Sequence, residues 1–351
     1  MQKIFRISFA LLACALAGCS STLPELPPVT IPAVEPVRKA SAAEIRQRCA
    51  RFKALLAPLP VREIGFSHRS FDGFSPEKVC RFASDAGFNR ICLFISSSAE
   101  LDDRFAAFLK AAAAEKLTVD VMLRQEDFTA KHRGSSLMKS VDDRLSDLAE
   151  ICRQIRLKCD LPGKTASVDQ VIVAVSPHKF VSDTRDNAGQ IFAWSEKNAG
   201  PGLDNDMLML QAFELLNKLD TCGMKLAAGV PDFYHELAVQ GKVTRGRMND
   251  FCSLRKGKTP VYLLSGGGKP SQVVSGSREE FKSVDRGQDV VLEIELAGHT
   301  SSSAGKLRRR DWRDLEKILG YVIREHQKYP AFRGIMLAPL PIFKYLIMEQ
   351  D

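Results

Sequence analysis

The sequence predicts a parallel α/β protein, a (β/α)8 barrel, on three observations. Eight short apolar segments alternate with segments of helical periodicity between residues 61 and 337, a pattern typical of parallel βαβ units. Eight such units in one run fit a closed barrel with helices outside. The main alternative, an open doubly wound sheet, usually has fewer strands and a Gly-rich first turn. The first turn here reads SHRSFDGFSP and has no GxGxxG, so we expect the TIM-type barrel.

The elements are expected in a regular order. The first is a helix over 42–56, where apolar residues recur at helical spacing. Short apolar runs predict strands at 61–67, 89–95, 118–123, 170–175, 225–230, 260–264, 289–296 and 333–337. Helical patterns between them start at Pro76, cover 101–115, 141–158 and 204–221, surround His235 and Met248, and cover 278–283 and 311–328. Pro76 suits the first helical turn, where the missing N–H costs nothing.

The composition is that of a soluble globular protein with a large core. Of 351 residues, 45% are hydrophobic and 26% charged, enough for one domain of roughly 250 residues or more. The formal net charge is +8, partly from Lys3, Arg6 and the basic cluster 308–310. No nucleic-acid-binding motif accompanies this charge. We expect no nucleic-acid partner, and the charge weakly favours anionic glycans or lipid headgroups.

The N-terminal stretch has the layout of an export signal. It reads MQKIFRISFALLACALAGC, with a basic start and an apolar run over 7–16 that is too short to span a membrane. Its end, the LAGC of 16–19, resembles the lipobox of bacterial lipoproteins. The resemblance implies that Cys19 receives the lipid, palmitate included, and anchors the protein in the membrane. Ser20 is then compatible with outer-membrane sorting in the cell envelope. The alternative is an ordinary cleaved signal with a chance cysteine.

A proline-rich segment separates this signal from the barrel. Residues 20–40 contain five prolines, which exclude a helix and favour an extended, semi-rigid spacer. We therefore expect a signal peptide over 1–18, a tether over 19–40 and a barrel domain over 41–351. No later segment is apolar for long enough to cross a bilayer.

The cysteines and histidines show no metal-binding pattern. No CxxC, HExxH or HxH spacing occurs, so we expect no metal and no cofactor. Seven cysteines remain beyond the signal and the anchor, and an odd number leaves one thiol unpaired in a monomer. We interpret them mainly as small buried residues. They are Cys49, Cys80, Cys92, Cys152, Cys159, Cys222 and Cys252.

The seventh strand carries two carboxylates on one face. Alternate residues of a barrel strand face the interior. Leu292, Ile294 and Leu296 share one parity and would pack on the helices, so Glu293 and Glu295 would point inward. An unpaired buried charge is costly. The alternative to a functional role is therefore a structural ion-pair network inside the barrel, with Arg124 as a candidate partner.

Barrel active sites lie where the strands end, and this rule selects the remaining candidates. Trp194, in the long connection after the fourth strand, is a candidate platform for a sugar ring, although such aromatics also attach loops to barrels. Candidate acids are Glu126, Asp127 and Asp232; candidate ligand-binding residues are Arg124, His68, His178, Tyr234, Glu293 and His299.

The barrel and its strand-seven glutamate resemble the large clan of (β/α)8 glycoside hydrolases. In that clan the nucleophile is a Glu that ends strand seven, and only Glu295 matches the position. The resemblance implies hydrolysis of a glycan by paired carboxyl groups. The clan's acid follows strand four, where this sequence reads AVSPHKF and has no carboxylate. The acid would then be one of the three candidates above or Glu196. The alternative is an envelope lipoprotein whose barrel binds a ligand or acts as a scaffold without hydrolysis.

Overall fold

The described structure covers the strands, several helices and a few turns. In the computed structural model of the chain these are residues 41–67, 75–124, 137–160, 168–174, 216–231, 261–264, 270–284, 288–295 and 312–338. The chain divides into two units, Met1–Lys39 and Ala40–Asp351. All described residues belong to the second.

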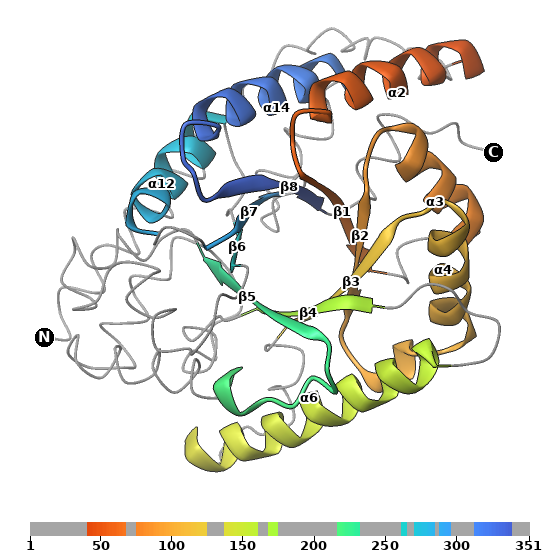
Figure 1. The fold of residues 1–351 in the computed structure, drawn as a ribbon, viewed down its shortest axis with the longest axis vertical. Helices are drawn as coiled ribbons and strands as arrows, with labels where there is room; N and C mark the ends of the chain where they lie inside the picture. Colours follow the sequence, from red (N-terminus) through yellow and green to blue (C-terminus); the bar gives the residue numbers. More distant parts are fainter. Residues whose placement is uncertain are drawn as a thin grey trace, which may run out of the picture. The chain divides into compact units, whose positions relative to one another are not determined.

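Eight parallel strands close into a barrel in the order β1 to β8, with β8 pairing back onto β1 (Figure 1). Every neighbouring pair is parallel, so the strands share one direction and their carboxyl ends meet at one edge. The strands are β1 Val61–Ser67, β2 Arg90–Ile95, β3 Thr118–Arg124, β4 Val168–Ala174, β5 Lys225–Pro231, β6 Val261–Leu264, β7 Val290–Glu295 and β8 Phe332–Ala338. The closed parallel barrel confirms the predicted arrangement of strands and excludes the open sheet.

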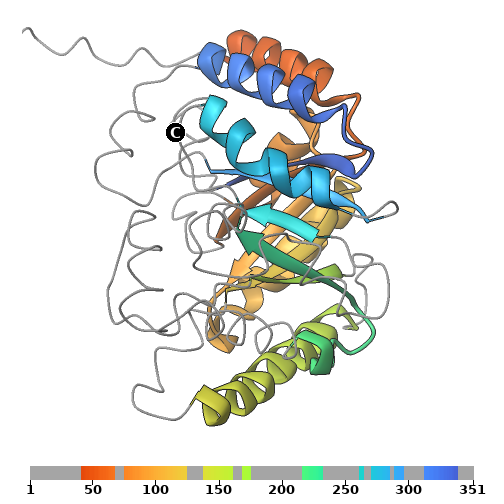
Figure 2. The same ribbon diagram turned by 90° about the vertical axis from the view of Figure 1, so that its left-hand side faces the viewer.

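The described helices lie outside the ring of strands, and α2 and α14 run side by side in both views (Figures 1 and 2). They are α2 Ala42–Leu56, α3 Pro76–Asp85, η2 Ser98–Glu100, α4 Asp103–Ala114, α6 Leu137–Cys159, α12 Pro270–Ser283 and α14 Trp312–His326. The helix α12 begins eight residues before the predicted 278, because its buried Val273, Val274 and Ser277 continue the helical spacing through Gly276.

The first helices begin at side-chain caps. Ser41 and Glu44 form a reciprocal capping box at α2, which satisfies donors that lack helical partners. Ser75 accepts from the N–H of Lys78 at α3, and Asp102 accepts from two N–H groups at α4. These polar residues fix where each of the three helices starts.

Two apolar cores divide the strand residues by parity. The larger core joins one face of the strands to the helices and includes Leu292 and Ile294 of β7. The smaller core contains strand residues only and fills the barrel. Its members are Cys92, Phe94, Met122, Ile172, Ala227, Val291, Met336 and Ala338.

Glycines allow close contacts in the barrel wall. A Cβ on Gly334 of β8 would lie 1.8 Å from the carbonyl oxygen of Val61, so only glycine fits where β8 closes onto β1. A Cβ on Gly65 would lie 3.0 Å from the ring of Phe94 and 3.2 Å from the sulfur of Met336. Gly65 thus makes room for two large side chains inside the barrel.

Candidate functional site at the carboxyl ends of the strands

The two acids of β7 lie at different depths, with Glu295 at the carboxyl-terminal edge of the barrel and Glu293 two residues deeper, opposite Met336 of the inner core. Glu293 is buried and shares the parity of Val291, which belongs to the inner core. Leu292 and Ile294 pack toward the helices, as predicted. Glu295 is the last residue of β7, opposite Ala338 of β8. It has the inward parity of Glu293, one step nearer the mouth, and its side chain lies outside the described part of the structure.

The inside of the barrel is acidic. Burial raises the pKa of the Cys92 thiol well above its ordinary value, and three neighbouring carboxylates raise it further. These belong to Glu63, Asp120 and Glu293, while Arg90 acts in the opposite direction. Cys92 therefore stays a neutral thiol, which is a poor nucleophile.

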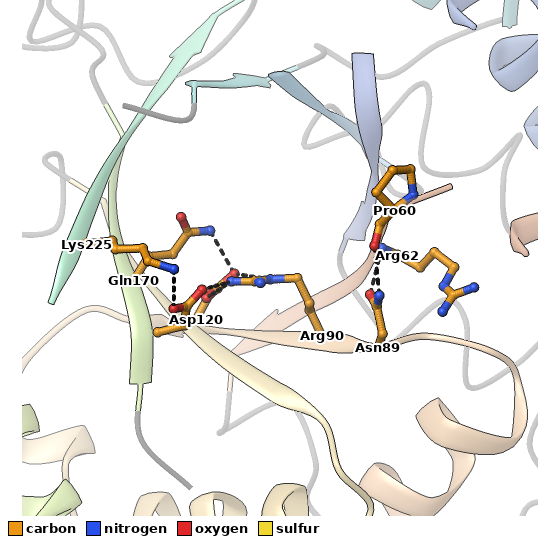
Figure 3. Close-up of polar contacts among 8 residues, drawn as sticks. Pro60, Arg62, Asn89, Arg90, Asp120, Gln170 and Lys225 are labelled. Carbon is orange, nitrogen blue, oxygen red and sulfur yellow. Dashed lines mark hydrogen bonds and ion pairs between the residues drawn. The ribbon is translucent and has the colours of Figure 1, made fainter. Parts of the chain in front are cut away.

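A charge network fills the opposite, amino-terminal end of the barrel (Figure 3). Arg90 donates to both carboxylate oxygens of Asp120, at 2.9 and 2.6 Å, and to Asp169 at 2.8 Å. Gln170 donates to Asp120 at 2.9 Å, and Lys225 donates to Asp169 at 2.8 Å. Four strands are joined in this way, because the residues come from β2, β3, β4 and β5.

The partners of Asp169 favour the ionised form of its carboxylate. Partial burial raises the pKa of Asp169, but hydrogen bonds from Lys225 and Arg90 outweigh it and lower the pKa overall. Asp120 is fully buried, and a buried carboxylate requires such partners. This network is a different one from the ion pairing of Glu293 and Glu295 with Arg124 that the sequence offers as an alternative, and that alternative stays a prediction.

Asn89 joins the starts of β1 and β2 beside this network (Figure 3). Its side chain accepts from the N–H of Arg62 at 2.9 Å and donates to the carbonyl of Pro60 at 2.8 Å. These bonds tie two chain segments at the amino-terminal end, so the residue has a structural role.

Another carboxylate at the mouth, that of Glu100, follows β2. Glu100 is 2% exposed and accepts two hydrogen bonds from Ser96, from the N–H at 2.8 Å and from the hydroxyl at 2.6 Å. No residue that follows this strand is among the site residues predicted from the sequence. The available signal was the acidic residue five positions after the strand end at Ile95, within loop reach of the mouth.

Most of the predicted site residues lie outside the described part of the structure. The backbone of Arg124 ends β3 beside Ala174 of β4, which places the residue at the mouth; its side chain is not among those described. Outside the described residues altogether are Cys19, His68, Glu126, Asp127, His178, Trp194, Asp232, Tyr234 and His299. Of the predicted residues, the structure brings Glu295 and Arg124 to one end of the barrel and places Glu293 deeper inside it, and their roles stay predictions.

The described residues contain no group of three or more His, Cys, Asp or Glu side chains that could hold a metal ion. Within the same residues, no helix is both long and apolar enough to span a bilayer. Six described cysteines are free. Four of them are buried, as expected of small core residues: Cys49, Cys80, Cys92 and Cys152.

Comparisons with known proteins identify no family for this chain. No family model matches the chain, and no curated protein matches it. A Bacteroides ovatus GH5 xyloglucanase is similar at 11% identity and TM-score 0.47, covering 90% of this chain and 75% of that one. A Clostridium thermocellum xylanase 10B follows at 12% identity and 0.46, covering 82% and 60%. A GH113 β-1,4-mannanase has 8% identity and 0.42, covering 84% and 90%. These are glycoside hydrolases, and likeness at this level does not extend to the chemistry of this chain.

Proposed function

We propose that this protein binds a glycan at the carboxyl-terminal mouth of its barrel and hydrolyses it with carboxylate chemistry. The observation that carries the proposal is the inward parity of the β7 acids. Glu293 is buried on the inner face, and Glu295 stands at the strand's end, the position from which parallel barrels act on their substrates.

In this proposal Glu295 acts on the anomeric carbon, as nucleophile or as stabiliser of the positive charge that develops there. A second carboxyl group gives a proton to the leaving oxygen while the glycosidic bond breaks, and water supplies the new hydroxyl. Glu126, Asp127 and Asp232 are the candidates for this acid, since all three follow strand ends. Arg124 orients a carboxylate, and Trp194 offers its ring face to a sugar.

A specific observation favours the second candidate function, a barrel that binds its ligand without cutting it. The carboxyl end of β4 is occupied by Ala174, which is buried, with its Cα 3.1 Å from where a Cβ on Gly229 would lie. The following residues read VSPH and supply no carboxylate. In the glycoside-hydrolase arrangement described above, the acid stands at this place.

We also propose that the protein is attached to the outer membrane through a lipid on Cys19. The basic start, the short apolar run and the LAGC tetrapeptide support it, and several acyl chains give firm anchoring at about 0.8 kcal/mol for each buried CH2. The test is metabolic labelling with an alkyne-modified palmitate in cells that express wild type or Cys19→Ser. Label on the variant equal to that on wild type would overturn the lipid assignment.

The hydrolytic proposal is tested with wild type and Glu295→Gln on cellohexaose, xylohexaose, mannohexaose, chitohexaose and peptidoglycan sacculi, with new reducing ends as the readout. We expect turnover to fall at least about a hundredfold, because the variant loses charge stabilisation in the transition state. Glu150→Gln on the exposed face of α6 is the matched control and should retain full turnover.

The outcomes separate the two candidate functions. Equal turnover by wild type and Glu295→Gln would remove Glu295 from the mechanism. Binding of a glycan by wild type without any cleavage would establish the binding barrel instead. If wild type neither binds nor cleaves any of the five glycans, both candidates fail.

A further inference from the structure

The turn after β2 presents one hydroxyl at the mouth of the barrel. Cys92 and Phe94 belong to the inner core, whereas Ile95 packs toward the helices. Ser96 directly follows the strand and has the sequence parity of Cys92 and Phe94. It is half-buried, so part of its surface is accessible at the carboxyl end of β2.

The buried carboxylate of Glu100 fixes the orientation of this hydroxyl. Glu100 accepts from the N–H of Ser96 at 2.8 Å and from its Oγ–H at 2.6 Å. In the second of these bonds the serine hydroxyl is the donor. The Ser96 proton therefore lies on the Glu100 side, and the oxygen's lone pairs remain for a different donor.

Closing a turn does not require a buried charge in this protein. The capping residues Ser41, Ser75 and Asp102 close comparable turns with exposed hydrogen bonds. Glu100 instead is 2% exposed, and burial of a carboxylate costs free energy that its partners must offset. The burial of Glu100 has one further consequence, which is that the oxygen of Ser96 is held as a hydrogen-bond acceptor.

We propose that Ser96 Oγ accepts a hydrogen bond from a hydroxyl of the bound glycan, and that Glu100 is the positioning residue that sets its direction. The inference rests on the proposed function and deepens it, since it names the group that the site recognises. Such an acceptor selects a sugar hydroxyl, which can donate, over fluorine or a methyl ether, which cannot.

The test measures affinity by titration calorimetry with cellohexaose, xylohexaose, mannohexaose and chitohexaose. For those that bind wild type, we expect Ser96→Ala to weaken binding about three- to tenfold, the range of one neutral hydrogen bond. Glu100→Gln should weaken it similarly, because the amide N–H donates to Ser96 and turns its proton toward the ligand. Ser98→Ala, at an exposed position of the same turn, should bind as wild type does.

Monodeoxyfluoro analogues of the bound sugar separate recognition from a structural effect. One analogue should bind wild type three- to tenfold more weakly than the parent sugar, and Ser96→Ala should bind that analogue and the parent equally. A merely structural serine would leave the same discrimination in both proteins. Equal parent affinity in wild type and Ser96→Ala, or undiminished discrimination in the variant, overturns the inference and leaves the proposed function standing. If wild type binds none of the four sugars, glycan recognition itself fails, and the inference fails with it.

Discussion

The two ends of the barrel use polar residues in opposite ways. At the amino-terminal end, Arg90, Asp120, Asp169 and Lys225 bind one another across four strands. At the carboxyl-terminal end, the last position of β7 and the turn after β2 carry Glu295 and the Ser96–Glu100 pair. The charges at the amino-terminal end pair with one another inside the wall, whereas in the proposed function the acid at the mouth acts on a ligand. An ionisable group of this barrel therefore has to be interpreted from the end of the barrel that it occupies.

The largest expected effect is the loss of stability when the charge network at the amino-terminal end is disrupted. Asp120→Ala should lower the free energy of unfolding by about 3–5 kcal/mol, because it leaves the partly buried Arg90 without its main partner and the buried Gln170 without its acceptor. Urea denaturation followed by circular dichroism measures this loss. The matched control is Glu150→Ala on α6, whose carboxylate is exposed and pairs with Arg153; its midpoint should stay where the wild-type midpoint is. A change at Asp120 as small as the control's would abolish the distinction between the two ends.

A substitution where β8 pairs with β1 tests how tightly the amino-terminal end of the barrel is packed. Gly334→Ala should cost about 1–3 kcal/mol or more, since the new methyl would overlap the carbonyl of Val61 at the amino-terminal end of β1. Gly320→Ala is the control: it lies within α14, where a Cβ meets only Leu55 at 3.8 Å. That variant should gain about 0.5–1 kcal/mol from the better helix propensity of alanine. Denaturation midpoints that shift in the same direction for both variants would contradict the claim that only glycine fits at position 334.

Local sequence patterns were sufficient to predict the positions of the strands. Each observed strand overlaps its predicted segment, with ends that differ by at most two residues, because short apolar runs between helices have few other interpretations. The start of α12 was missed because Pro270, Ser271 and Gly276 resemble a loop. In the structure Pro270 is the first helical residue, where proline is favoured, and burial of Val273 and Phe281 outweighs the cost of the glycine.

The only part of the site that the sequence predicted is the part that follows from the alternation of side chains along a strand. Alternation along 290–295 placed Glu293 on the inner face, and the structure confirms it. Alternation also puts Asp120 on the face of Met122, yet nothing local identifies Arg90, thirty positions earlier, as its partner. The Ser96–Glu100 contact depends on a short 3-10 turn, which leaves no periodic signal. Partners fixed by tertiary contacts are the part that a single sequence does not reveal.

Acid should weaken the amino-terminal network in a defined pH range. Hydrogen bonds from Lys225 and Arg90 lower the pKa of Asp169 below its ordinary 3.8. A lowered carboxylate pKa stabilises the fold above the unfolded value, and this contribution is lost as the pH falls from about 3.8 through the folded pKa. Asp169→Asn removes the titration, so the difference in unfolding free energy between wild type and variant should shrink below pH 4. A difference that is constant from pH 6 to pH 2.5 would show that Asp169 is not linked to stability.

The smallest expected effect concerns a contact between the outer helices α12 and α14, away from both ends of the barrel. His326 of α14 is buried, with Nδ1 2.8 Å from the carbonyl of Val322 and Nε2 2.7 Å from Ser277 Oγ of α12. A carbonyl only accepts, so Nδ1 carries the proton in the neutral ring and Nε2 accepts from Ser277. Protonation forces the hydroxyl away from Nε2 and toward the carbonyl of Val273, which is 2.8 Å away.

Burial lowers the pKa of His326 below its ordinary 6.5; the nearby Lys328 and Arg278 lower it too, while the bond to Val322 and the charge of Glu325 oppose them. The unfolded chain therefore takes up this proton first, and stability falls as the pH drops from about 6.5 to the folded pKa, then levels. His326→Gln should lack this decline, which lies above the range where Asp169 titrates. Unfolding free energies of wild type and variant from pH 8 to pH 4.5 measure it. Parallel curves would mean that the contact between α12 and α14 does not depend on the charge of the ring, and that acid acts on the amino-terminal network alone.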